Sequence, residues 1–164
     1  VAAQTWHEGL TLDHVFVAGG SAGTAAGVVL GLWLLRAEAT VHVISVSRTN
    51  AELRELLLGL INETAALLGV DVAGIEDTIR LYDEFVGAGY GALTTEGLAA
   101  IELLAREEGL VLDPVYTGKT AAGMLSILRH GDVTAEETVL FLHTGGVPGL
   151  FAKAAELQQA HRAR

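Results

Sequence analysis

The stretch Val17-Ala-Gly-Gly-Ser-Ala-Gly-Thr24 lies between a strand-like run and a helix-like run and decides the fold class. Residues 13–18 are a short apolar run next to glycines, as in a buried strand, and residues 22–36 have helical composition. Glycines in such a turn let backbone amides approach a ligand. Ser21 and Thr24 add hydroxyl groups, and the helix N-terminus adds partial positive charge. The stretch therefore predicts a strand, a phosphate-binding turn and a helix; a tight turn with capping hydroxyls is the alternative.

The glycine spacing narrows the class of phosphate ligand. Gly20, Gly23 and Gly27 do not reproduce the G-x-G-x-x-G pattern of dinucleotide-binding loops. No Gly-Lys-Ser/Thr follows, so the turn is not a P-loop either. A phosphorylated cofactor or a mononucleotide therefore fits better than NAD or ATP.

Strand-like and helix-like segments alternate along the rest of the chain. Asn50 is the expected N-cap of one helix, Thr94 or Thr95 caps another, and residues 1–9 read as the tail of a helix that ends at a glycine. Strands alternating with helices predict an α/β domain, a three-layer parallel sheet with helices on both faces. We expect strands at 40–46, 79–82 and 138–143, an extended stretch at 111–115, and helices at 51–68, 95–108, 117–129 and 148–161.

Composition excludes several classes of partner. Of the 164 residues, 20 are acidic and 10 are Lys or Arg, and no basic run stands out, so nucleic acid is not an expected partner. The absence of cysteine excludes disulfides and thiolate metal sites, and the histidine spacing gives no metal pattern. The apolar stretch 15–35 contains too many glycines and hydroxyls for a membrane span. We expect a cytoplasmic enzyme domain.

Two further glycine turns follow extended stretches, Tyr116-Thr-Gly-Lys-Thr120 and His143-Thr-Gly-Gly146. A third element, Gly87-Ala-Gly-Tyr-Gly91, places Tyr90 in an irregular loop. In an open α/β sheet, ligands bind beyond the carboxyl ends of the strands. These polar turns are therefore predicted to converge on one pocket, although each could also be plain architecture.

Five blocks of the sequence carry a further signal, residues 18–27, 82–91, 95–97, 112–119 and 139–148. Together these blocks resemble the D-cysteine desulfhydrase and 1-aminocyclopropane-1-carboxylate (ACC) deaminase family. These are pyridoxal-5′-phosphate (PLP) enzymes of the tryptophan synthase β-like fold (fold type II), and the resemblance implies the large, cofactor-binding domain of that fold. Asp-Pro-Val-Tyr-x-Gly-Lys followed by His-Thr-Gly-Gly is the most specific part.

The resemblance implies roles for residues of the glycine turns and for Tyr90. Residues of the first turn would hold the cofactor phosphate, and the family usually has glycine where Ala22 stands. Thr144, with Gly145 beside it, would offer its hydroxyl to the pyridine nitrogen. Tyr90 and Tyr116 would line the substrate side as acid/base or stacking groups. The phosphate-binding set comprises Gly20, Ser21, Ala22, Gly23 and Thr24.

The resemblance also suggests a substrate. ACC deaminases carry Glu and Leu where this chain has Thr117 and Thr144. This difference favours β-elimination of D-cysteine to pyruvate, hydrogen sulfide and ammonia. It also makes Thr117 a candidate catalytic residue. The alternatives are an ACC deaminase, another β-eliminase such as an L-cysteate sulfo-lyase, a non-catalytic phosphate- or nucleotide-binding module, and a purely structural domain. The family further implies an amino-acid substrate and a homodimer.

The family's Schiff-base lysine has no counterpart in this sequence. Lys119 and Lys153 are the only lysines, and neither matches the catalytic position. We therefore expect residues 1–164 to be one cofactor domain from the C-terminal part of a longer enzyme, without the lysine-bearing segment and most of the small domain. On this interpretation the chain alone is inactive.

Overall fold

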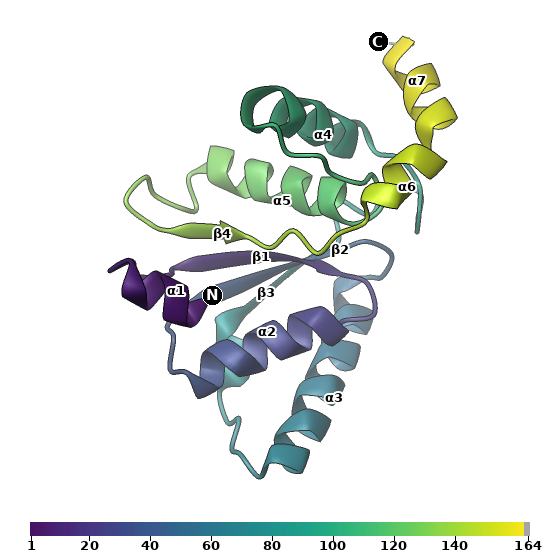
Figure 1. Ribbon diagram of the computed structural model, residues 1–164. Coiled ribbons are helices and arrows are strands. Elements are labelled where there is room, and N and C mark those ends of the chain that lie inside the picture. The colour runs from purple at the N-terminus through teal and green to yellow at the C-terminus, as the bar shows by residue number, and fades with distance from the viewer. Residues whose placement is uncertain (163–164) are drawn as a thin grey trace.

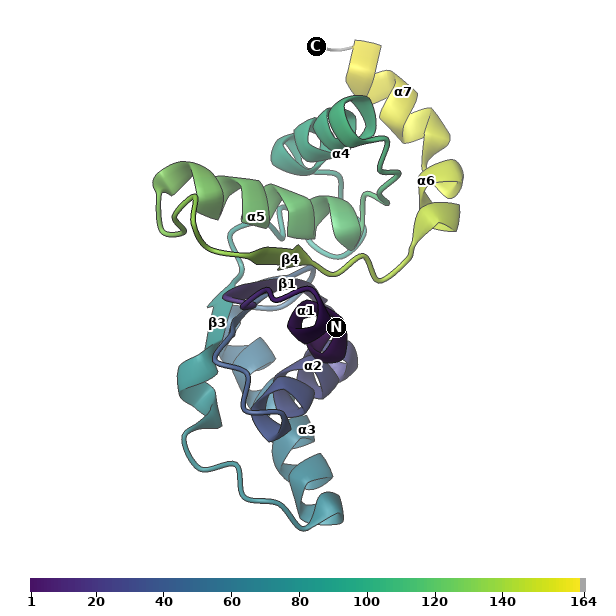
Figure 2. The ribbon, with the colours of Figure 1, turned by 60° about the vertical axis from the view of Figure 1, so that its left-hand side comes forward.

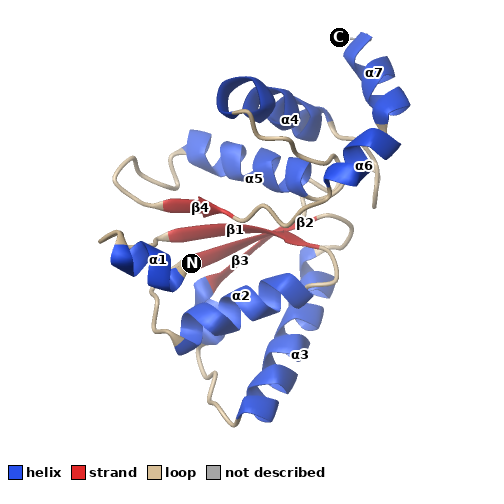
Figure 3. Ribbon diagram, in the orientation of Figure 1, coloured by secondary structure: helices blue, strands red, loops and turns tan. Residues whose placement is uncertain are grey.

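The computed structural model describes residues 1–162, and a four-stranded parallel sheet lies at its centre (Figures 1 and 3). The strand order is β3-β2-β1-β4, so β2 and β1 are the inner strands, each paired on both sides. The carboxyl ends of the strands meet at one edge because all pairings are parallel. The strands are β1 (His14–Gly19), β2 (Thr40–Ser45), β3 (Ile79–Tyr82) and β4 (Val139–Phe141).

Helices cover both faces of the sheet, which confirms the predicted three-layer α/β class. One face is covered by α2 (Gly23–Leu34) and α3 (Asn50–Leu68). The other face is covered by α5 (Thr117–His130), with α4 (Thr95–Glu108) packed on the outer side of α5. Figure 2 shows these layers from the side.

Shorter helices complete the described chain, and two predicted bounds change. The predicted helix at 148–161 is two helices, because the chain turns at Lys153. The predicted strand at 138–143 shortens to the three residues of β4, which pairs on one side only, with β1. The shorter helices are α1 (Ala2–His7), η1 (Ile75–Thr78), α6 (Val147–Ala152) and α7 (Ala154–Arg162).

The cap of α3 lies one residue earlier than predicted. Thr49, not Asn50, is the N-cap: its hydroxyl accepts from the Glu52 amide, and the Glu52 carboxylate accepts from the Thr49 amide in a capping box. The Asn50 amide instead donates to Asp83 Oδ2 at 2.7 Å. For α4, Thr94 is the cap, through a bond from the Gly97 amide.

The two faces of the sheet have separate apolar cores. On the α2 and α3 side, aliphatic side chains from the sheet and both helices form one large buried cluster. On the α5 side, a smaller cluster includes Phe16 and Ile44. A Cβ on Gly123 of α5 would lie 2.7 Å from Ile44 Cδ1, so this glycine lets α5 pack closely on β2. Within residues 1–162, no helix has the length and apolar character needed to cross a bilayer.

Candidate functional site

The first glycine corner joins β1 to α2 at the carboxyl edge of the sheet. Ala22, the N-cap of α2, has φ of 63°, a left-handed conformation that costs a non-glycine residue free energy. The first amides of α2 lack intrahelical partners, as at any helix start. Among the described residues, the hydroxyls of Ser21 and Thr24 have no hydrogen-bond partner. The corner thus presents a cluster of free donors where helix geometry favours an anion.

Arg48 and Tyr116 hold this corner in place. The Arg48 guanidinium donates to the Gly20 carbonyl at 2.6 Å. A Cβ on Gly20 would lie 3.4 Å from Tyr116 Cε1, so the tyrosine ring packs close to bare backbone. The lack of a side chain at Gly20 therefore makes room for Tyr116.

The second corner is organised by the buried carboxylate of Asp113. This carboxylate accepts hydrogen bonds from the amides of Val115, Tyr116 and Thr117 at 2.8–2.9 Å, and from the Thr117 hydroxyl at 2.8 Å. A carboxylate at the start of α5 is also favoured by the helix dipole. Asp113 thereby fixes the backbone that presents Tyr116.

The third corner, residues 143–146, follows β4. The ring of His143 links it to the second corner, since Nε2 donates to the Val111 carbonyl at 3.0 Å and Nδ1 accepts from the Gly145 amide at 3.2 Å. A Cβ on Gly146 would lie 2.5 Å from Asp113 Oδ1. Gly146 has φ of 94°, so both its conformation and this close approach require glycine.

The three corners converge on one pocket of about 240 Å³, as the sequence predicted. The turn between β1 and α2, the ring of Tyr116 and the side chain of Thr144 therefore share one cavity at the carboxyl edge of the sheet. Of the predicted site residues, the pocket lining contains Gly20, Ser21, Ala22, Thr24, Tyr116, Thr144 and Gly145, together with Ala18 and Gly146.

Three predicted site residues, Gly23, Tyr90 and Thr117, lie outside that lining. The Tyr90 hydroxyl is hydrogen-bonded to the Tyr116 hydroxyl, and the Tyr90 side chain is otherwise largely exposed. This bond, followed by partial burial, raises the pKa of Tyr116. Thr117 is buried, and its hydroxyl is bonded to Asp113. The structure thus brings Tyr90 to the rim of the pocket and places the Thr117 side chain in the helix cap.

Sequence reasoning missed two residues that shape the site, Asp113 and Arg48. The signal for Asp113 was present, because Asp-Pro just before a helical segment is typical of a capping carboxylate. Arg48 gave no such signal. Its contact with Gly20 joins residues 28 positions apart, and only the parallel pairing of β1 with β2 brings them together.

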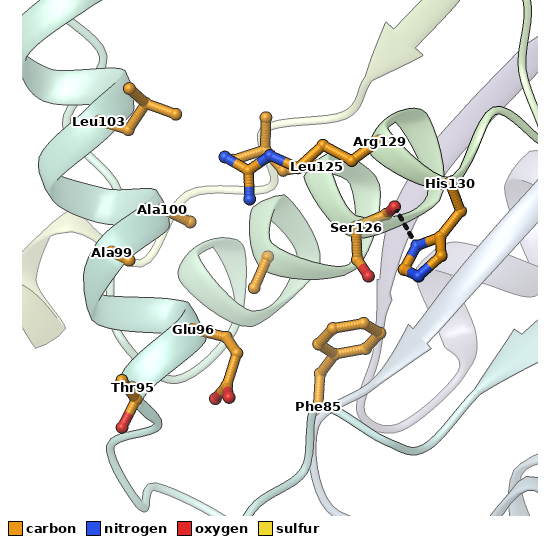
Figure 4. Close-up of a pocket in the computed structure, with 11 residues that line it drawn as sticks. Phe85, Thr95, Glu96, Ala99, Ala100, Leu103, Leu125, Ser126, Arg129 and His130 are labelled. Carbon is orange, nitrogen blue, oxygen red and sulfur yellow. Dashed lines mark hydrogen bonds between the residues drawn. The ribbon is translucent and has the colours of Figure 1, made fainter.

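A larger hollow of about 400 Å³ lies between α4 and α5 (Figure 4). Its floor is formed by small and aliphatic side chains, including Leu103 and Leu125, and Glu96, Arg129 and His130 stand at its exposed rim. It borders the last turn of α5, at the far end of that helix from Tyr116. None of the glycine motifs reaches it, so it is not the predicted site.

Polar rings form a row across the sheet beneath α5. His42 Nε2 lies 3.0 Å from His14 Nδ1, and His42 Nδ1 lies 3.0 Å from the Tyr82 hydroxyl. His14 Nε2 lies 3.2 Å from Glu137 Oε1, and the His42 ring stacks on Phe16. Burial, followed by the neighbouring His14, lowers the pKa of His42 to about 4. Among the described residues, no group of three or more His, Cys, Asp or Glu could hold a metal ion.

Comparison with known proteins gives a family match. A family model described as "Pyridoxal-phosphate dependent enzyme" matches residues 1–145. A D-cysteine desulfhydrase from Yersinia enterocolitica is 46% identical over 143 residues, which are 87% of this chain and 43% of that protein. A Pyrococcus abyssi protein, named provisionally as a 1-aminocyclopropane-1-carboxylate deaminase, is 42% identical over 149 residues, which are 91% of this chain and 44% of that protein.

Solved structures give the same result for the fold. The crystal structure of an ACC deaminase homologue superposes with a TM-score of 0.83 at 39% sequence identity, covering 92% of this chain and 44% of that one. This likeness confirms the predicted fold. The chain spans less than half the length of the curated relatives it matches.

Proposed function

Because this chain belongs to the pyridoxal-phosphate dependent enzyme family, we propose that the pocket at the carboxyl edge of its sheet binds PLP for a carbon–sulfur lyase acting on D-cysteine. The single observation that carries this proposal is the convergence of the three glycine corners. When bound, PLP supplies the electron-withdrawing ring needed for β-elimination from an amino acid. The chain's own residues bind and orient that ring.

The residues present fit a phosphorylated pyridine ring. The first turn of α2 offers free amides and the unpartnered hydroxyls of Ser21 and Thr24, which suit a phosphate dianion. Thr144 lies across the same pocket, where its hydroxyl would contact the ring nitrogen. A neutral hydroxyl does not hold a proton on that nitrogen as a carboxylate would, and this suits a reaction in which the leaving group soon departs with the electrons.

Tyr90 and Tyr116 are the proposed substrate-side groups. Their hydroxyls share one hydrogen bond, and the pKa of Tyr116 is raised mainly by that bond, so this phenol keeps its proton at neutral pH. A neutral phenol can orient a substrate or donate a proton to a leaving thiolate. Thr117 supports this pair indirectly, through the Asp113 cap.

Neither lysine of the sequence is placed for covalent attachment of the cofactor. Lys119 is buried and bonded to three carbonyl oxygens, and Lys153 is paired with Glu156 on α7. Neither lines the pocket. We therefore propose that turnover needs a lysine from outside these 164 residues, and that the chain acts as one cofactor domain of a longer enzyme, homodimeric as its family resemblance implies.

A binding experiment tests the cofactor site directly. Pyridoxamine 5′-phosphate has no aldehyde and cannot react with surface amines, so its binding reports the pocket alone. We expect it to raise the melting temperature of the chain more than pyridoxamine does. We also expect Thr24→Val to weaken the affinity for pyridoxamine 5′-phosphate at least fivefold. Thr64→Val is the matched control, because the Thr64 hydroxyl lies on α3 and bonds the Leu60 carbonyl. Equal shifts with and without the phosphate would reject the site.

ACC deamination is the second candidate, favoured by the names of the Pyrococcus relative and of the superposed structure. Thr144 lines the pocket but Thr117 does not, so the choice of D-cysteine depends mainly on Thr144. Hydrogen sulfide release from D-cysteine and ammonia release from ACC separate the two when a lysine-containing form is assayed. Sulfite release from L-cysteate would identify the third alternative.

A further inference from the structure

The side chain of Lys119 is fully buried and has no acidic partner. Its ammonium donates to the carbonyl oxygens of Val86 at 2.7 Å, Gly89 at 3.0 Å and Val46 at 3.4 Å. None of the ion pairs in the described chain includes Lys119. Burial lowers the pKa of this amine. A buried cation without a counter-ion is costly, so the three carbonyl bonds must offset a large desolvation penalty.

The position of Lys119 on its helix adds to that cost. It is the third residue of α5, and the positive end of a helix dipole disfavours a cation in the first turn. The helix dipole therefore does not explain a lysine at this position. Its contacts with the neighbouring loop do.

That loop, residues 83–93, has little structure of its own. Gly87, Gly89 and Gly91 have φ values of 66°, 136° and 74°, conformations with few steric restraints for glycine. Two backbone hydrogen bonds lie inside the loop, from the amides of Val86 and Ala92. The Lys119 ammonium therefore supplies the contacts that tie the middle of the loop to α5 and, through Val46, to the end of β2.

The start of α5 is linked to both members of the tyrosine pair. Tyr116 is the residue just before α5, and Tyr90 follows Gly89 directly. Lys119 bonds the Gly89 carbonyl from the first turn of α5, so one short segment fixes Tyr116 and, through the loop, Tyr90. The bond between the two hydroxyls is the result.

We propose that Lys119 is a positioning residue, whose buried ammonium holds the loop at 86–91 so that Tyr90 meets Tyr116 at the rim of the pocket. The inference rests on the proposed function only in calling this pair part of the substrate side. The loop, the lysine and the tyrosine contact exist without cofactor, so the test uses the chain alone.

The first test compares Lys119→Met with Lys153→Met, which removes the other, surface lysine. Tyrosine rings labelled with ¹³C at Cζ report their hydroxyl bonds at pH 7, and Tyr90→Phe gives the resonance of Tyr116 without its partner. In Lys119→Met we expect the Tyr116 resonance to move to that reference position, and the amides of residues 86–91 to exchange at least tenfold faster. Amides of β1 and β2 should change by less than threefold, and Lys153→Met should leave all signals in place.

A chemical rescue separates the charge from the shape of the side chain. The sequence contains no cysteine, so Lys119→Cys introduces a unique thiol. Alkylation of the unfolded variant with bromoethylamine, followed by refolding, restores an ammonium at the same reach. Iodoacetamide gives a neutral adduct as control. We expect the aminoethylated protein alone to recover the parent Tyr116 resonance and slow exchange at 86–91. This comparison also decides the matter if Lys119→Met does not fold.

Two results would overturn the proposal. One is a folded Lys119→Met variant with the parent Tyr116 resonance and parent exchange rates at 86–91. The other is a failure of aminoethylation to restore the resonance in a refolded protein. Binding of pyridoxamine 5′-phosphate to Lys119→Met is measured in parallel and should change by less than threefold, because Lys119 does not line the pocket. If pyridoxamine 5′-phosphate does not bind the parent chain, the cofactor proposal is rejected, whereas the Lys119 result is unaffected.

Discussion

The two faces of the sheet are stabilised in different ways. The face under α2 and α3 is a continuous aliphatic cluster, in which Leu53, Leu57 and Ile61 are fully buried. The face under α5 carries the polar row of His14, His42 and Tyr82, and the start of α5 buries Thr117, Lys119 and Thr120. Aliphatic packing dominates the first face, whereas the second combines smaller apolar clusters with buried, hydrogen-bonded polar side chains. The pocket receives residues from both sides, since the start of α2 and the residue before α5 both line it.

The largest expected effect comes from creating a cavity on the aliphatic face. Leu57 has no solvent exposure, so Leu57→Ala should reduce the free energy of unfolding by about 3 to 4 kcal/mol, as for large-to-small substitutions at fully buried sites. Chemical denaturation at pH 7 measures this. Leu67→Ala is the control, because Leu67 on the same helix is 88% exposed and should change the stability by about 0.5 kcal/mol or less. Similar losses in both variants would contradict the description of this face.

Sequence patterns were sufficient for the aliphatic face and for the positions of the glycine turns. Apolar runs and residue composition located β1, β2 and α2, and a polar cap followed by a helix-like run located α3. The polar row could not be predicted. His14, His42 and Tyr82 lie on three different strands, and only the register of β1 with β2 and of β2 with β3 aligns them.

The candidate site was predicted in part, for the same reason. Three glycine turns after extended stretches indicated one pocket, because parallel strands end at one edge. Two of these turns follow strands, β1 and β4, whereas the turn at Tyr116 follows a stretch that is not a strand. The positions of Thr117 and Tyr90 relative to the pocket depend instead on local side-chain bonds, to Asp113 and to Tyr116. No spacing rule encodes such bonds.

The polar face should make the stability depend on pH. The unfolded chain protonates a histidine near pH 6.5, whereas burial and His14 lower the pKa of His42 in the folded protein to about 4. The unfolded state therefore binds more protons between these values. The contribution of His42 to the free energy of unfolding is therefore fully present above pH 6.5. It falls as the pH drops toward 4, by a total of about 3 kcal/mol. Glu137, Arg80 and Asp132 also face this row.

Denaturant unfolding of the parent and of His42→Gln across pH 4 to 7 checks this expectation. The glutamine keeps a donor and an acceptor for His14 and Tyr82 but does not titrate, so the slope in this window should flatten. His7→Gln, at an exposed position of α1, should leave the slope unchanged. If parent and His42→Gln lose stability in parallel, another group is responsible for the pH dependence.

The smallest expected effect concerns the start of α3, on the aliphatic face, where a polar cap supplements the apolar packing. The Thr49 hydroxyl accepts from the Glu52 amide, so Thr49→Ala should reduce the free energy of unfolding by about 1 kcal/mol. Asn50 Oδ1 is buried without a partner, and Asn50→Ala keeps the backbone amide that bonds Asp83, so its cost should stay within about 0.5 kcal/mol. Denaturant melts of both variants decide between the two capping positions. A larger loss from Asn50→Ala than from Thr49→Ala would return the cap to Asn50 and contradict the capping box at Thr49.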